Sequence, residues 1–119
     1  MHTIKSDDYK LEPTSRERAF IGMYLSAVKL SELGKTDFDF DEVFLRESII
    51  DCLAFYKQIS CYLDPKNIEQ AGYDFWITRN FHGNGFWTRP ELYGERYSEK
   101  FTTLAESFGE AHALFGGEA

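Results

Sequence analysis

The sequence predicts an α+β domain in which three main helices pack on a small antiparallel sheet. Apolar residues recur at helical spacing in three segments, one segment alternates with a period of two, and a turn rich in glycine and asparagine follows it. A chain of 119 residues, 43% of them hydrophobic and 17% aromatic, has the size and composition of one compact core. We expect residues 14–119 to form this domain and the polar residues 1–13 to form a flexible N-terminal arm.

Two long amphipathic segments predict the first two helices. The first, over about 15–33, starts at Thr14 and Glu17, which have the spacing of a capping box. The second, over about 42–63, keeps helical spacing for five turns, and Asp39 or Asp41 is placed to cap it.

Shorter signals follow along the chain. Asp64 and Pro65 resemble a cap followed by proline at the first helical position, which predicts a short helix that Gly72 ends. A third amphipathic helix is expected over about 95–108, where Gly109 stops it.

The sheet is predicted from residues 73–78, where alternate side chains differ in character. Tyr73, Phe75 and Ile77 would face one side of a strand. The turn that follows and residues 86–88 would complete a hairpin over about 73–88, and residues 110–115 would add one more strand at its edge.

Cys52 and Cys61 lie nine residues apart in the second predicted helix. This separation places them on opposite faces, about 13 Å apart along the axis, so they form neither a disulfide nor a shared metal site. Two buried, reduced thiols are expected, and no cofactor or metal is predicted.

Net charge and hydropathy restrict the class of protein. A formal charge of -7 disfavours binding to duplex DNA through phosphates. No apolar run approaches the roughly 20 residues of a membrane-spanning helix, and the N-terminus lacks the apolar stretch of a signal peptide. We therefore expect a cytoplasmic protein without a membrane partner.

The densest collection of chemically active side chains lies between residues 74 and 87. One interpretation is a binding surface on the hairpin, in which polar donors stand beside an aromatic platform. The alternative is structural: Arg79 pairs with Asp74, the polar side chains of the turn bond its backbone, and both tryptophans are core residues. The candidate binding residues are Asp74, Trp76, Arg79, Asn80, His82 and Trp87.

The same stretch resembles a family of small acidic proteins found in bacteriophages and mobile elements. The resemblance rests on the pattern Asp-Phe-Trp-x-Thr-Arg-Asn-x-His-Gly-x-Gly-Phe-Trp, with Ala71-Gly72 before it and the ending 107–110, and it extends more loosely over most of the chain. Tyr73 stands where histidine is common in the family, and Phe81 where glycine is usual. The family has no established activity, so the resemblance implies origin and cellular context.

Nothing in the sequence predicts an enzyme. The three histidines have no ligand spacing, and no serine or cysteine nucleophile stands beside Asp74 and His82. Acidic residues are instead segregated, with seven acids against two bases over 31–51. Such a surface can imitate the phosphates of DNA, or it can be an ordinary solvated face. The candidate acidic surface comprises Asp37, Asp39, Asp41 and Glu42.

The function expected from these features is that of a phage-type accessory protein. It would bind a bacterial host protein of the defence or nucleic-acid machinery, in the host cytoplasm, and modulate or inhibit it, with acidic mimicry of DNA as one mechanism. A second hypothesis is a module that binds single-stranded nucleic acid on the aromatic hairpin. A third is a homodimer joined through Phe38 and Phe40 or through an exposed sheet edge.

Overall fold

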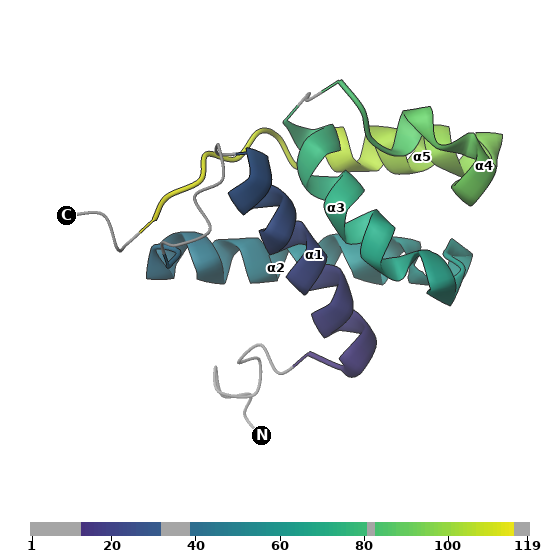
Figure 1. Ribbon diagram of the computed structural model, residues 1–119. Helices are drawn as coiled ribbons and strands as arrows, with labels where there is room; N and C mark the ends of the chain where they lie inside the picture. The colour runs from purple at the N-terminus through teal and green to yellow at the C-terminus, as the bar shows by residue number, and fades with distance from the viewer. Residues whose placement is uncertain (1–12, 32–38, 81–82, 116–119) are drawn as a thin grey trace.

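The computed structural model describes residues 13–31, 39–80 and 83–115, and these residues form a helical fold (Figure 1). Within them the only β pairing is an isolated antiparallel bridge between Phe40 and Phe115. The predicted α+β class is therefore wrong. The elements are α1 (Ser15–Ser31), α2 (Glu42–Ile59), η2 (Ser60–Tyr62), η3 (Pro65–Asn67), α3 (Ile68–Arg79), η4 (Phe86–Thr88), α4 (Pro90–Tyr93) and α5 (Glu95–Glu106).

The three long helices α1, α2 and α3 form the body of the molecule. Helix α1 crosses α2 and packs along α3, while α4 and α5 cover another side of α3 (Figure 1). The single turn η4 lies against both α3 and α5. Helix α5 is thus the outermost long element on its side of the fold.

The predicted helix starts are confirmed. The Thr14 N–H donates to Glu17 Oε1 at 2.8 Å, and the Glu17 N–H donates to Thr14 Oγ1 at 3.2 Å, which completes the capping box. Asp41 caps α2, because its Oδ2 accepts from the N–H groups of Val43 and Phe44. Asp64 accepts from the backbone N–H two residues later, as expected for a cap before proline.

Aromatic side chains fill the core where the long helices meet. The rings of Phe55 and Phe75 stack with centroids 4.1 Å apart and planes inclined by 6°. Phe20 from α1 and Phe86 from η4 contact Phe55, and Phe108 packs edge-on against Phe75. This cluster joins segments that are distant in sequence, so its geometry depends on the whole fold.

Residues 73–78 belong to α3, and the strand predicted for them is wrong. Nine of the twelve residues of α3 are buried. A helix that is buried on most sides has little polar face, so its sequence loses the period of 3.6 that identifies surface helices. The alternation of Tyr73, Phe75 and Ile77 is compatible with such a helix.

Gly72 lies inside α3 and does not end a helix, which corrects a second prediction. A Cβ atom at this position would lie 2.1 Å from the carbonyl oxygen of Phe20. The glycine therefore permits the backbones of α1 and α3 to approach closely. Gly72 is thus explained by the packing of two helices, which local turn signals in the sequence do not indicate.

The hairpin over 73–88 and the strand over 110–115 are also absent from the described residues. After α3 the chain folds back so that the Phe86 N–H donates to Thr78 Oγ1 at 3.1 Å. Gly85, with φ at +146°, makes this return, and a Cβ atom there would collide with Thr78. The C-terminal segment forms one β bridge, in which Phe115 stacks on Phe40 with ring centroids 5.3 Å apart.

The cysteines are both free, as expected, but only one of them is buried. Cys52 lies in the core, and Cys61 is exposed in η2, just after α2. The expectation of two buried thiols is therefore wrong for Cys61. The N-terminal arm through residue 12, the predicted end of the first helix after residue 31, and residues 81–82 and 116–119 lie outside the described residues.

Candidate functional site

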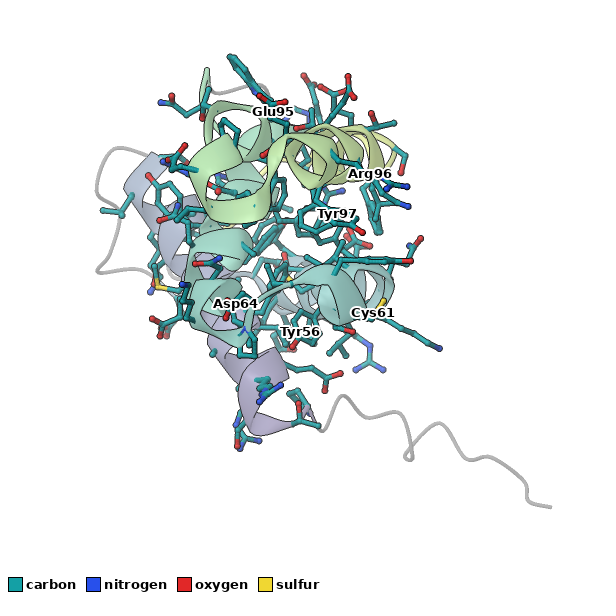
Figure 2. All side chains as sticks on the ribbon, turned by 90° about the vertical axis from the view of Figure 1, so that its right-hand side faces the viewer. Tyr56, Cys61, Asp64, Glu95, Arg96 and Tyr97 are labelled. Carbon is teal, nitrogen blue, oxygen red and sulfur yellow. The ribbon has the colours of Figure 1, made fainter. Side chains whose placement is uncertain are left out.

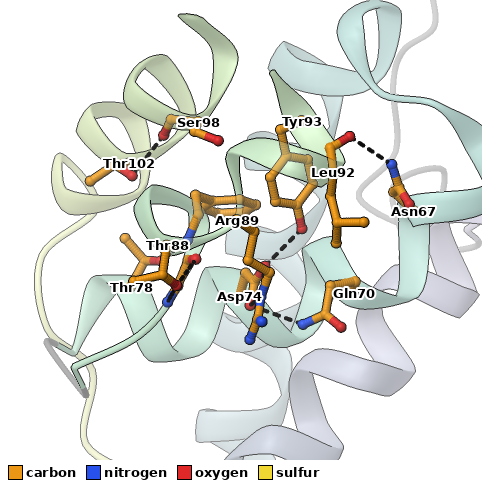
Figure 3. Close-up of polar contacts among 12 residues, drawn as sticks. Asn67, Gln70, Asp74, Thr78, Thr88, Arg89, Leu92, Tyr93, Ser98 and Thr102 are labelled. Carbon is orange, nitrogen blue, oxygen red and sulfur yellow. Dashed lines mark hydrogen bonds and ion pairs between the residues drawn. The ribbon is translucent and has the colours of Figure 1, made fainter. Parts of the chain in front are cut away.

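Asp74 is the centre of a buried polar network between α3 and α4 (Figure 3). Its carboxylate is fully buried and accepts from Arg89 Nε at 3.0 and 2.9 Å, from the Tyr93 hydroxyl at 2.7 Å and from Gln70 Nε2 at 3.1 Å. Burial raises the pKa of the Asp74 carboxyl, and the hydrogen bonds from Tyr93 and Arg89 offset part of that rise. The network fastens α4 to α3 and leaves no carboxylate oxygen open to a ligand.

Arg79 is the centre of a second network at the other end of α3. Its guanidinium is 4% exposed and donates to Asp51 Oδ2 at 3.0 Å and to the Tyr24 hydroxyl at 3.0 Å. It also donates to the backbone carbonyls of Phe108 and Gly109, at 3.0 and 2.8 Å. A single side chain thereby joins α1, α2, α3 and the segment that follows α5.

The remaining residues of the predicted binding surface are dispersed. Asn80 Nδ2 donates to the Trp76 carbonyl, and Asn80 Oδ1 accepts from the Ala111 N–H. The Trp76 indole is buried and donates to Ser31 Oγ at 2.8 Å, whereas Trp87 is 54% exposed. His82 lies outside the described residues.

The structure therefore does not bring Asp74, Trp76, Arg79 and Trp87 together on one surface. The structural alternative describes Asp74, Trp76, Arg79 and Asn80 better, although the ionic partners differ from those expected. Arg79 pairs with Asp51, and Asp74 pairs with Arg89.

The candidate acidic surface is also only partly available. Asp39 and Glu42 are exposed, whereas the Asp41 carboxylate is occupied as the cap of α2. Asp37 lies outside the described residues. Any acidic mimicry would thus depend on Asp39 and Glu42 among these four, and replacing Asp41 would disturb the helix itself.

The described residues form neither a metal centre nor a buried, reactive thiol. They contain no group of three or more histidine, cysteine, aspartate or glutamate side chains that could hold a metal ion. Burial raises the pKa of the Cys52 thiol, which disfavours the reactive thiolate.

No helix in the described residues is long and apolar enough to cross a membrane.

The outer face of α5 and its surroundings have the character of a binding surface. We define the α5 surface as two depressions along opposite edges of this helix, which share the exposed residues Glu99 and Thr103. In Figure 2, Tyr97 lies on the side of α5 that faces Cys61, and Glu95 lies toward the other edge. Exposed aromatic rings stand beside both depressions.

The first depression, the tyrosine groove, lies between α5 and the end of α2 and has a volume of about 860 Å³. The Tyr62 ring stacks on Tyr97 with centroids 5.0 Å apart, and Lys100 Nζ lies 5.2 Å from the Tyr62 centroid. Arg96 Cζ lies 5.8 Å from the Tyr97 centroid. The groove is therefore an aromatic surface bordered by two cations and by the Glu99 carboxylate. Its lining residues are Gln58, Tyr62, Arg96, Glu99, Lys100, Thr103, Leu104 and Ser107.

The second depression, the tryptophan recess, has a volume of about 460 Å³ and lies between α5 and the turn that carries Trp87. Two carboxylates, those of Glu95 and Glu99, border it. Because Glu99 borders both depressions, the recess is lined by two acids and no base, whereas the groove is lined by two bases and this one acid. The lining residues of the recess are Trp87, Pro90, Glu95, Ser98, Glu99, Thr102 and Thr103.

Most of the α5 surface was not identified from the sequence. The apolar stripe of residues 95–108 predicts the helix but not the use of its polar face. The available signal was the pair of four-residue repeats Glu95/Glu99 and Arg96/Lys100, which place acids on one edge of the helix and bases on the other. Tyr62 gave no comparable signal, because its exposure depends on where α2 ends.

Comparison with known proteins yields no match to a family model, a curated protein or a solved structure.

Proposed function

We propose that this protein is a phage-type, non-enzymatic accessory protein that binds a bacterial host protein in the cytoplasm and modulates it through the α5 surface. The phage context comes from the sequence pattern over residues 74–87 and from no other observation. The α5 surface is the part of the proposal that the geometry supports.

The observation that carries the proposal is the exposure of two large aromatic side chains beside α5. Trp87 is 54% exposed and Tyr62 is 45% exposed, whereas most other large rings among the described residues are buried. Tryptophan, tyrosine and arginine dominate the energetics of protein interfaces, and here they stand at the edges of two depressions bordered by charges. Such a surface suits a protein partner that inserts side chains beside the rings.

Two other mechanisms are less well supported. A hairpin that stacks single-stranded nucleic acid loses its platform, because Trp76 is buried and residues 73–79 are helical. Acidic mimicry of DNA retains Asp39 and Glu42, but α2 also presents Arg46 and Lys57 to solvent. The proposed partner is a host protein of the defence or nucleic-acid machinery, bound through shape complementarity and aromatic contacts.

Affinity capture with matched variants tests the proposal. The tagged protein is incubated with nuclease-treated bacterial lysate, in parallel with Trp87→Ala, Tyr62→Ala and the control Leu30→Ala. Leu30 is 60% exposed at the end of α1, so its truncation removes a comparable apolar surface outside the α5 surface. Circular dichroism establishes that each variant is folded.

We expect one host protein to be captured in stoichiometric amount by the wild type and by Leu30→Ala. Each aromatic truncation should weaken that capture at least about tenfold, the effect of an interface hot spot. Equal capture by all four proteins would overturn the assignment to α5. Loss of capture with Asp39→Asn/Glu42→Gln, but not with the aromatic variants, would favour acidic mimicry instead.

A further inference from the structure

Charges are segregated along the two edges of α5. At about 100° per residue, Glu95 and Glu99 lie on the edge of α5 toward the tryptophan recess, and Arg96 and Lys100 lie about 100° further round, toward the tyrosine groove. Glu99, nearest the middle of the exposed face, lines both depressions. All four side chains are exposed. The acidic edge and the basic edge therefore run side by side along the same two turns.

The helix itself gains little from this arrangement, because its like-charged pairs offset the favourable Arg96/Glu99 pair and the favourable position of Glu95 in the first turn. The pairs Glu95/Glu99 and Arg96/Lys100 are like-charged pairs at a separation of four residues, which weaken an isolated helix slightly. Within the described residues none of these four side chains forms an ion pair. Their charges are thus available to a partner that presents the opposite sign along each edge.

We propose that the α5 surface pairs with the α5 surface of a second copy of this chain, with the two helices parallel and related by a twofold axis that runs along them. A rotation about such an axis places the acidic edge of one copy against the basic edge of the other. Glu99 then faces Lys100 of the second copy, and Glu95 faces its Arg96. In each pair the two residues differ by about 1.5 Å in height along the axis.

Charge selects the parallel arrangement over the antiparallel one. In a twofold pair with antiparallel helices, each edge meets the same edge of the other copy, so that acids face acids and bases face bases. Like charges in an interface cost binding free energy and suppress the wrong alignment. Only the parallel pairing makes the surface complementary to itself, as an isologous interface requires.

The aromatic residues fit the same symmetry. Trp87 stands on the acidic edge, so the twofold rotation places it opposite the tyrosine groove of the second copy, beside Tyr62 and Leu104. The groove has a volume of about 860 Å³ and could accommodate an indole ring. Each copy contributes one tryptophan and one groove, so the apolar contact occurs twice.

This pairing replaces the dimer contact suggested by the sequence. Phe40 stacks on Phe115 and contacts Phe44, so its ring is already used within the chain. Phe38 lies outside the described residues, and those residues contain no sheet edge. If the host protein also uses the α5 surface, it competes with self-association, but the dimer does not depend on any host partner.

The test is a charge exchange within one chain, measured on the purified protein. Sedimentation velocity compares the wild type with Glu99→Lys, Lys100→Glu and the double variant Glu99→Lys/Lys100→Glu, from about 10 µM to about 1 mM and in about 50 mM salt. Each single variant places two like charges in both symmetric contacts. The double variant restores opposite charges in both, with the signs reversed.

The expected result is a mass that rises toward the dimer with concentration for the wild type and the double variant, and a dimer dissociation constant at least about tenfold larger for each single variant. The single changes shift the net charge in opposite directions, so a simple effect of net charge would not weaken both. Trp87→Ala should also weaken the dimer, and Leu30→Ala should not.

Two outcomes would overturn the proposal. The wild type could be monomeric at every concentration, or the double variant could fail to recover the dimer while circular dichroism shows all the variants folded. A foreign partner with fixed charges gives no reason for the double exchange to restore binding. Failure here therefore leaves the host-capture experiment intact, and failure of that experiment leaves this one intact.

Discussion

The segment over residues 74–89 and helix α5 both carry many charged and aromatic side chains, but they use them in opposite ways. In the first, Asp74 and Arg79 are buried and their polar atoms are satisfied by partners within the chain. In the second, Glu99 and Lys100 are exposed and form no ion pair within the described residues. Similar residue types therefore hold the fold together in one region and are available for binding in the other.

The comparison shows that burial, more than residue chemistry, separates a structural polar group from a functional one. A charge that leaves water needs hydrogen bonds and an opposite charge, and both networks supply them. A charge that stays in water needs neither, so its arrangement is free to match a partner. Truncating a buried charged residue and an exposed one of the same type provides the sharpest test.

The largest effect is expected from Arg79→Ala. This change leaves the Asp51 carboxylate, the Tyr24 hydroxyl and two backbone carbonyls without their shared donor. We expect the free energy of unfolding to fall by about 3 kcal/mol, near the low end for a broken buried ion pair, because Asp51 is 36% exposed. Urea denaturation followed by circular dichroism measures it.

Arg96→Ala on the α5 surface is the matched control. The same truncation there removes one cation–π contact with Tyr97 and should change the free energy of unfolding by less than about 0.5 kcal/mol. If both variants lost a comparable free energy of unfolding, Arg79 would not differ from Arg96 in its contribution to the fold.

The sequence predicted local features of this fold well. The capping box at Thr14, the cap at Asp41 and the amphipathic helices that became α1, α2 and α5 depend on signals within a few residues of each other. Each of these helices has an exposed face, so the period of 3.6 is visible in its sequence.

The sequence failed where the structure depends on distant contacts. Helix α3 is buried on most sides, so Phe75 and Trp76 show no polar stripe, and Gly72 resembles a helix stop although it accommodates α1. The ionic partners of Asp74 and Arg79 lie 15 and 28 residues away, a separation that spacing rules do not reach. The burial of the predicted binding residues results from these distant contacts and therefore leaves no local signal in the sequence.

Alkaline pH should destabilise the protein by an intermediate amount. Burial raises the pKa of the Tyr24 and Tyr93 hydroxyls above 10.0, and burial also raises the pKa of the Cys52 thiol above 9.0. Above about pH 9 the unfolded chain therefore releases protons that the folded chain retains, and stability falls as pH rises.

Between pH 8 and pH 10 we expect a loss on the order of 2 kcal/mol from these groups, more than half of it from Cys52. Urea denaturation at both pH values measures the loss, and the absorbance of tyrosinate should rise with unfolding. Tyr93→Phe lowers stability at pH 8 but should reduce the dependence on pH, since one of the protons is then absent. An unchanged pH dependence in Tyr93→Phe would show that this hydroxyl does not titrate with unfolding.

The smallest effect on stability is expected at Trp87, and it distinguishes the two regions optically. Trp76 is buried against Ser31 and Trp87 is 54% exposed, so acrylamide should quench two populations of tryptophan fluorescence with different efficiency. Trp87→Phe should remove the accessible population and change the free energy of unfolding by less than about 0.5 kcal/mol. Trp76→Phe should remove the protected population and cost more, because the buried indole loses packing and the half-buried Ser31 hydroxyl loses its donor. If Trp87 proved as protected as Trp76 in dilute protein, the α5 surface would already be covered in the monomer, and neither a host protein nor a second copy could use it.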